Sequence, residues 1–180
     1  MRWVQFHRTG QKKIRLRHGE RGDAQSSLEL FRSIVAEEEF FVLSASEFHR
    51  TLLEKEQQIH HHCIQPQSCI FMAHAQETLV GQAALLGGGL LRNRHVAELE
   101  MFISKGYRGC GLGKALLNML IEWAKQHSQL KKISLSVFLD NKAAISLYKG
   151  CGFVEEGVLK GAFREVDNRM RDQVLMALFL

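Results

Sequence analysis

Residues 106–114 read Gly106-Tyr107-Arg108-Gly109-Cys110-Gly111-Leu112-Gly113-Lys114 and lie between two contrasting stretches of the sequence. The stretch before them, Val96 to Ser104, is apolar and typical of a strand. After them, up to about residue 127, apolar residues recur at helical spacing, as Leu112, Leu116, Met119, Leu120 and Trp123. The pattern predicts a strand, a glycine-rich loop and an amphipathic helix in succession.

A glycine-rich loop in this position predicts a phosphate site. Glycines let successive backbone N–H groups converge on one anion, and the start of a helix carries a partial positive charge. Arg108 and Lys114 would add charge at the rim. A Walker loop does not fit, because Leu112 and Gly113 stand where Lys and Ser/Thr are needed, and a dinucleotide fingerprint would need glycine at position 114. A turn that serves chain geometry alone is the remaining alternative.

The rest of the chain predicts a mixed α/β fold around one sheet. Asp23 or Ser26 is the expected N-cap of the first helix. Strands are expected at 12–17, 69–74, 78–86, 132–139, 158–163 and 171–178, and further helices at 26–37, 46–61 and 141–149. The resulting order is β-α-α-β-β-β-α-β-α-β-β.

Composition favours one globular domain over residues 1–180. Hydrophobic residues make up 46% and charged residues 24%, with a net charge of +5, which suits an anionic ligand. No apolar run is long enough to span a membrane, and residues 1–10 lack the apolar region of a signal peptide, so we expect a cytoplasmic protein without membrane partners. Basic and aromatic residues are not interleaved, so no nucleic-acid partner is expected.

The cysteines and the histidine run suggest no metal centre. None of the four cysteines forms a C-x-x-C pair, which predicts reduced thiols. In the stretch His60-His61-His62-Cys63, neighbouring residues of a helix would point in different directions. We therefore expect structural or solvated histidines and no bound metal.

Two motifs together resemble the GNAT superfamily of N-acetyltransferases. The first is R-x-x-G-x-G, as Arg108, Gly111 and Gly113, which is similar to the pyrophosphate-binding motif of that family. The second comes about 30 residues later and resembles the family's late helix, with Asn141, Ala144, Leu147-Tyr148 and Gly152-Phe153. The ending Met176 to Phe179 resembles its last strand, whereas residues 1–11 look like an N-terminal extension without a counterpart.

The resemblance implies a mostly antiparallel sheet with a splayed parallel strand pair, flanked by about four helices. It also implies acetyl-CoA as cosubstrate, with the pantetheine arm lying along the strand before the loop. By position, the main chain of Met101, Phe102 and Ile103 would bind that arm, and Asn141 would reach it or the adjacent backbone. The pyrophosphate would be held by Arg108, Gly109, Cys110, Gly111, Leu112, Gly113 and Lys114, with Cys110 as a backbone donor rather than a nucleophile.

The resemblance further assigns catalytic roles. Glu98, with Glu100 as the next candidate, would take a proton from the acceptor ammonium directly or through water, and Tyr148 would protonate the departing thiolate and contact the cofactor. The N–H of Phe102 would hold the acyl oxygen. The family usually has a bulge in this strand, so strict alternation is not expected beyond it. The alternatives are salt-bridging glutamates and a tyrosine that only packs beneath the cofactor.

The expected activity is direct acetyl transfer to a primary amine of a small molecule or a protein N-terminus. The acidic segment 37–41 could recognise a cationic amine, or it could be a solvated turn that tucks a phenylalanine into the core. Dimers are frequent in the family, so a homodimer is among the expected partners. The competing class is a GNAT-like module that binds CoA for regulation without catalysis.

Overall fold

The computed structural model describes residues 4–9, 12–37, 40, 42, 45–127, 129–165 and 167–180. Within these ranges the chain forms eight strands and four α-helices. In chain order they are β1 (Val4–Thr9), β2 (Lys12–His18), α1 (Ala24–Val35), α2 (Leu52–Ile64), β3 (Cys69–Ala75), β4 (Thr78–Gly87), β5 (Val96–Ile103), α3 (Leu112–Lys125), β6 (Lys132–Phe138), α4 (Lys142–Gly150), β7 (Val154–Arg164) and β8 (Met170–Phe179).

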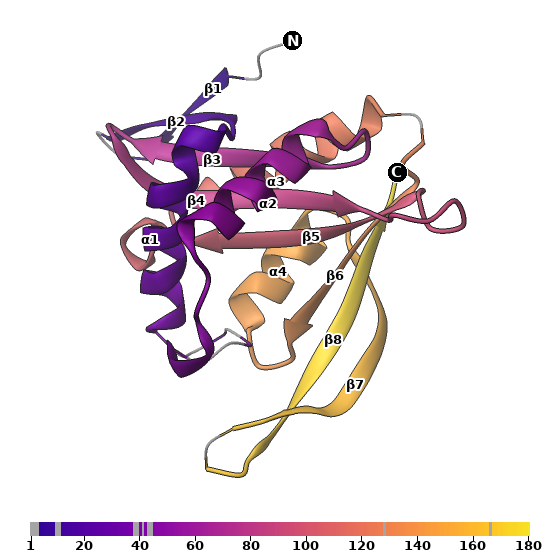
Figure 1. Ribbon diagram of the computed structural model, residues 1–180. Helices are drawn as coiled ribbons and strands as arrows, with labels where there is room; N and C mark the ends of the chain where they lie inside the picture. The colour runs from indigo at the N-terminus through magenta and orange to yellow at the C-terminus, as the bar shows by residue number, and fades with distance from the viewer. Residues whose placement is uncertain are drawn as a thin grey trace.

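All eight strands belong to one sheet, in the order β1-β2-β3-β4-β5-β6-β8-β7 (Figure 1). Every pair of neighbours is antiparallel except β5 and β6. This parallel pair is short, because only Val96–Glu98 of β5 pairs with Lys132–Ser134 of β6. The mixed, mostly antiparallel sheet with a splayed parallel pair is therefore confirmed.

Two apolar cores lie on opposite faces of the sheet. α1 and α2 cover one face with residues such as Phe31, Ile34 and Ile59. α3 and α4 cover the other, where the predicted stripe of α3 is buried throughout as Leu112, Leu116, Met119, Leu120 and Trp123. The period of apolar residues thus correctly predicted which side of α3 faces the sheet.

Residues 4–9 of the expected N-terminal extension are part of the sheet. Val4–Thr9 pairs with β2 in a regular antiparallel register, from Val4 opposite Arg17 to Thr9 opposite Lys12. Because β1 is a single short edge strand, the sequence carries little periodic signal for it.

The second helix begins later than expected, at Leu52 rather than Ser46. The cause is a capping box: the Thr51 hydroxyl accepts a hydrogen bond from the Glu54 N–H at 3.2 Å, and the Glu54 carboxylate accepts one from the Thr51 N–H at 2.7 Å. Ala45–Glu47 forms only a 3-10 turn. Another boundary also differs, since the strand expected at 158–163 already begins at Val154.

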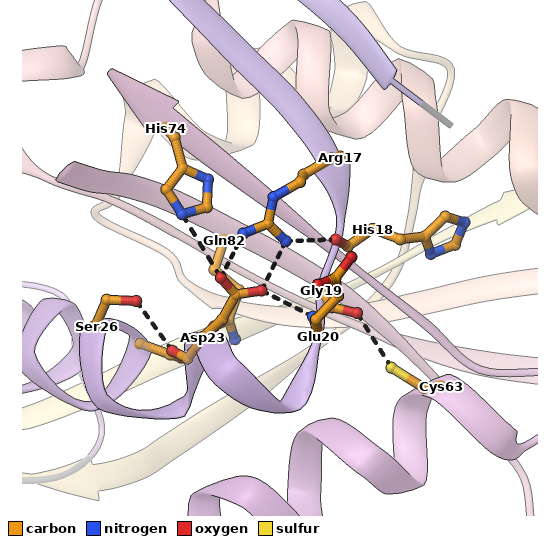
Figure 2. Close-up of polar contacts among 10 residues, drawn as sticks. Arg17, His18, Gly19, Glu20, Asp23, Ser26, Cys63, His74 and Gln82 are labelled. Atoms are coloured by element: carbon orange, nitrogen blue, oxygen red, sulfur yellow. Dashed lines mark hydrogen bonds and ion pairs between the residues drawn. The ribbon is translucent and has the colours of Figure 1, made fainter. Parts of the chain in front are cut away.

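A polar cluster ties β2 to the start of α1 (Figure 2). The Arg17 guanidinium donates to both oxygens of Asp23, at 2.8 and 2.5 Å, and Nε2 of His74 lies 3.7 Å from the same carboxylate. Burial alone would raise the pKa of Asp23, but the hydrogen bonds from Arg17 and from the Glu20 N–H lower it. Asp23 is the N-cap residue, yet its carboxylate holds Arg17 instead of capping α1.

Candidate active site

The glycine-rich loop begins where β5 ends and leads directly into α3. Gly109 and Gly111 have φ angles of 71° and 82°, a left-handed conformation that residues with a side chain adopt only with strain. The first hydrogen bond of α3 runs from the Ala115 N–H to the Gly111 carbonyl at 3.0 Å. The N–H groups of residues 112–114 therefore have no acceptor within the helix, and unpaired donors at the positive end of a helix suit an anion.

Gly113 has a different role from the two glycines before it. A Cβ atom added there would lie 3.0 Å from Leu147 of α4 and 3.3 Å from Ile103 of β5. An added Cβ at Gly109, in contrast, meets nothing within 4 Å. Gly113 thus lets the start of α3 approach both β5 and α4, whereas open space adjoins Gly109.

The main chain of β5 alternates between its two neighbours. The Gly88 N–H donates to the Val96 carbonyl, and the Ser104 N–H donates to the Val80 carbonyl, so the even-numbered residues of β5 are bonded to β4. The odd-numbered residues face the opposite side, where β6 has diverged beyond Glu98. The splayed edge of β5 therefore presents the backbone groups of Met101 and the N–H of Ile103, whose carbonyl accepts a hydrogen bond from Arg108.

The register between β4 and β5 tests two expectations: a bulge in β5 and an acyl oxygen held by the Phe102 N–H. The pairing of β4 with β5 runs from Gly81–Ile103 to Gly87–Ala97 without a shift, so the expected bulge is absent from this strand. The N–H of Phe102 then points toward β4 and its ring packs edge-on against Phe31 at 5.3 Å. An acyl oxygen held by the Phe102 N–H does not fit this register.

Arg108 links the loop to two other elements. Its Nε donates to the Ile103 carbonyl at 2.9 Å, and its Nη1 lies 2.6 Å from a carboxylate oxygen of Glu37, just beyond α1. The guanidinium is nevertheless partly exposed, so it is still accessible to an anion at the loop. Nothing in the sequence pattern indicated that Glu37 is its partner, because the two are 71 positions apart.

The acidic segment 37–41 is described only in part. Glu37 contacts Arg108, and Phe40 is a little over one-third exposed, with the Arg171 guanidinium 5.5 Å from its ring. Residues 38, 39 and 41, which were also expected to shape the acceptor site, lie outside the described residues.

Tyr148 lies on α4, on the same face of the sheet as the loop. Its side chain is buried against Phe153, with 5.7 Å between the ring centres. Burial raises the pKa of Tyr148 to about 12. The phenol is therefore protonated at neutral pH, as a proton donor must be.

Asn141 caps α4. Its side-chain oxygen accepts a hydrogen bond from the Ala144 N–H at 3.1 Å. Asn141 was expected to contact either the pantetheine arm or the adjacent backbone, and this hydrogen bond is a contact with the adjacent backbone.

Glu98 and Glu100 project from the other face of β5. They line a cavity of about 180 Å³ together with Gln58, His62, Ala84, Leu86 and Leu99. The two glutamates are exposed and share their face with Phe102, whereas Tyr148 lies in the core on the opposite face. The structure thus brings together the loop, β5 and α4, and separates the expected base and acid by the thickness of the sheet.

Lys55 of α2 is a buried cation that the sequence analysis missed. Its ammonium donates to the Gln58 side chain at 3.1 Å and lies 5.5 and 5.9 Å from the ring centres of Phe31 and Phe102. Burial lowers the pKa of Lys55 to about 8, although the charge of Glu100 opposes that shift. The sequence does contain a signal for the burial of Lys55: it precedes the buried Ile59 by four residues, so both lie on one face of the helix.

Lys55→Met is expected to stabilise the fold by roughly 3 kcal/mol at pH 7, because burying the charged lysine costs about 1.4 kcal/mol per unit of depressed pKa and the pKa falls from 10.5 to about 8. The unfolded chain takes up this proton near pH 10 and the folded chain only near pH 8. Wild-type stability therefore falls across that window as the pH falls, and the gain from methionine shrinks as the pH rises toward 10. Urea unfolding of both proteins at pH 7 and pH 10 measures this, with the exposed Lys125→Met as control. An equal gain at both pH values would contradict the prediction.

The histidine run contributes one buried side chain. Nδ1 of His62 lies 3.2 Å from the Leu85 carbonyl, and burial lowers the pKa of this imidazole. Among the described residues no group of three or more histidine, cysteine, aspartate or glutamate side chains could hold a metal ion. All four cysteines are free thiols.

A sequence model described as the acetyltransferase (GNAT) family matches residues 29–153. The chain belongs to the GNAT acetyltransferase family. The match contains the loop, β5 and α4 of the candidate site, and it excludes β1 and β8.

Two curated relatives match about half of this chain or less. An uncharacterized N-acetyltransferase of Methanocaldococcus jannaschii is 43% identical over 77 residues, which cover 42% of this chain and 34% of the relative. The spermidine N(1)-acetyltransferase of Vibrio cholerae is 34% identical over 89 residues, covering 49% of this chain and 50% of the relative. The matched region thus spans a third to a half of these relatives.

Solved GNAT structures match nearly the whole chain. A GNAT-family acetyltransferase of Streptococcus pneumoniae superimposes with a TM-score of 0.89 at 26% identity, covering 93% of this chain and 99% of the other. An acetyltransferase of Salmonella typhimurium solved with its cofactor acetyl-CoA gives a TM-score of 0.83 at 17% identity, covering 93% and 94%. The expected GNAT fold and membership of the acetyltransferase family are confirmed. No helix among the described residues has the length and apolar character needed to cross a bilayer.

Proposed function

We propose that this protein is an N-acetyltransferase that transfers an acetyl group from acetyl-CoA directly to a primary amine. The observation that carries the proposal is the position of the unpaired N–H groups at the start of α3. They adjoin the splayed edge of β5, so one ligand could place its phosphates on the loop and its arm along the strand. Relatives that acetylate spermidine and L-amino acids support an amine acceptor.

The residues present fit acetyl-CoA. The loop offers main-chain donors and open space beside Gly109, and the exposed Arg108 and Lys114 supply positive charge. The diphosphate would be held by Arg108, Gly109, Cys110, Gly111, Leu112, Gly113 and Lys114. The pantetheine arm would pair with the main chain of Met101 and Ile103. Asn141 and Tyr148 of α4 would lie on the other side of the arm. The N–H of Phe102 points toward β4, so Phe102 would not bind the arm through that group.

Each step of the proposed reaction has a candidate residue. Acetyl-CoA supplies a thioester that is activated for attack by an amine. Glu98, or Glu100 beside it, would take the proton of the acceptor ammonium directly or through water from one face of the sheet. Tyr148 would donate a proton to the departing thiolate from the other face, across the gap where β6 diverges from β5. An N–H on the splayed edge of β5, from Met101 or Ile103, would stabilise the charge that develops on the acyl oxygen. Because both substrates are bound side by side, no covalent acetyl-enzyme is needed.

The acceptor is proposed to be a cationic small-molecule amine or a protein N-terminus. The cavity beside Glu98 and Glu100 supports this, because two carboxylates attract an ammonium group. We further propose a cytoplasmic location, a single domain over residues 1–180 and a homodimer as the assembly. A GNAT-like module that binds CoA without turnover is the alternative, and it predicts binding of acetyl-CoA with no acetylation of any amine in a panel.

Thermal unfolding with and without acetyl-CoA tests the proposal, with ATP and NAD as controls. Acetyl-CoA at 100 times its Kd should stabilise the fold by ~2.7 kcal/mol. For a domain of this size, that corresponds to a rise in Tm on the order of 5–10 °C. A shift with acetyl-CoA alone would justify an amine screen, and the absence of a shift at millimolar acetyl-CoA would overturn the proposal.

A further inference from the structure

The N-terminal strand β1 reaches the glycine-rich loop through His7. In the β1–β2 register His7 lies opposite Ile14, and Ile14 is fully buried in the core beneath α3. Directly opposed residues of antiparallel strands point to the same face of the sheet. His7 therefore points to the face on which α3 and the loop lie, and it comes from outside the region that matches the family.

Two contacts place the His7 ring against the loop. Nε2 of His7 is 3.0 Å from the carbonyl oxygen of Cys110. A Cβ atom added at Gly111 would lie 3.4 Å from Cε1 and 3.7 Å from Nε2 of the same ring. Because a carbonyl oxygen only accepts hydrogen bonds, Nε2 must carry the proton in this contact.

The contact determines the direction of a phosphate donor. The peptide bond between Cys110 and Gly111 is planar and trans, so its carbonyl and its N–H point in opposite directions. Holding the Cys110 carbonyl toward His7 therefore turns the Gly111 N–H away from β1. Glycine at 111 has a wide choice of backbone conformations, and without such a restraint the peptide could rotate and present its carbonyl to the anion.

We propose that His7 is a positioning residue of the phosphate loop, which fixes the Cys110–Gly111 peptide so that the Gly111 N–H faces the diphosphate of the bound cosubstrate. This inference rests on the proposed use of acetyl-CoA. It gives the N-terminal segment a function in ligand binding in addition to its place at the sheet edge.

Calorimetric titration of His7→Ala with acetyl-CoA and with dephospho-CoA tests the proposal. A hydrogen bond of this kind contributes about 0.5–1.5 kcal/mol, so both ligands should bind about 3- to 10-fold more weakly. Both keep the diphosphate, and only the first carries the 3′-phosphate. An unchanged Kd, or a loss confined to acetyl-CoA, would overturn the proposal, because the latter outcome makes His7 a direct ligand of the 3′-phosphate.

Two further variants separate positioning from folding. His7→Gln keeps an N–H donor on a side chain of similar reach and should restore most of the affinity, whereas a purely steric role of the ring would not be rescued. His95→Ala, which removes an exposed histidine from the connection between β4 and β5, should bind like the wild type. If the wild type itself fails to bind acetyl-CoA, the proposed function fails. If the wild type binds and His7→Ala binds equally well, only the role of His7 is refuted.

Discussion

Gly111→Glu is expected to eliminate measurable binding of acetyl-CoA at millimolar concentration. The substitution places a carboxylate on the loop, where its Cβ would contact the His7 ring and its charge would lie within side-chain reach of the N–H groups that begin α3. Two like charges about 4 Å apart repel by about 4 kcal/mol near a protein surface, which corresponds to roughly a 10³-fold rise in Kd. Calorimetric titration with acetyl-CoA measures the loss.

Gly111→Gln is the matched control, because glutamine imposes the same strain at a φ of 82° without a charge. It should bind acetyl-CoA more weakly than the wild type but clearly better than the glutamate variant. Circular dichroism and Tm of both variants report any shared loss of stability. If the glutamate variant kept wild-type affinity, the assignment of this loop to the phosphates would be refuted.

Tyr148→Phe is expected to lower kcat by about 10²- to 10⁴-fold, the usual contribution of a general acid. Binding of acetyl-CoA should change little, because the ring that packs against Phe153 is retained. Since the pKa of Tyr148 is raised to about 12, the wild-type phenol stays protonated through neutral and mildly alkaline pH. Its titration should therefore cause no fall in the wild-type rate below about pH 11.

Steady-state rates with the best acceptor of an amine screen measure this effect. Lys125→Met, at an exposed residue near the end of α3, is the control and should keep near wild-type turnover. Turnover of Tyr148→Phe equal to that of the wild type would remove Tyr148 as the acid and leave protonation of the thiolate to solvent.

Local sequence signals predicted the elements whose residues interact with near neighbours in the chain. The apolar stripe of α3 and the glycines before it specify a helix and a tight loop by themselves, and both occur as expected. The start of α2 was misplaced because the Thr51–Glu54 capping box was overlooked, although it is a readable local motif.

Features that depend on distant pairing could not be predicted in this way. The direction of the Phe102 N–H follows from the register between β4 and β5. A bulge was expected in β5, and because none is present the Phe102 N–H points toward β4. The contact of Arg108 with Glu37 and that of His7 with Cys110 join residues 71 and 103 positions apart. Such contacts arise only once the sheet order is set.

The sheet order also determines when a nascent chain can complete the core around Tyr148. β8 lies between β6 and β7, so β7 leaves the ribosome before β8, its one neighbour among the described strands, has been made. Val174 and Met176 of β8 belong to the same core as Tyr148, which raises the pKa of that phenol by excluding water. Until β8 is inserted, β7 stays an unpaired strand and Tyr148 lacks part of its apolar surroundings. Synthesis must therefore proceed past residue 176 before the buried environment of Tyr148 is complete, and stalled or truncated chains would bear an open sheet edge prone to self-association.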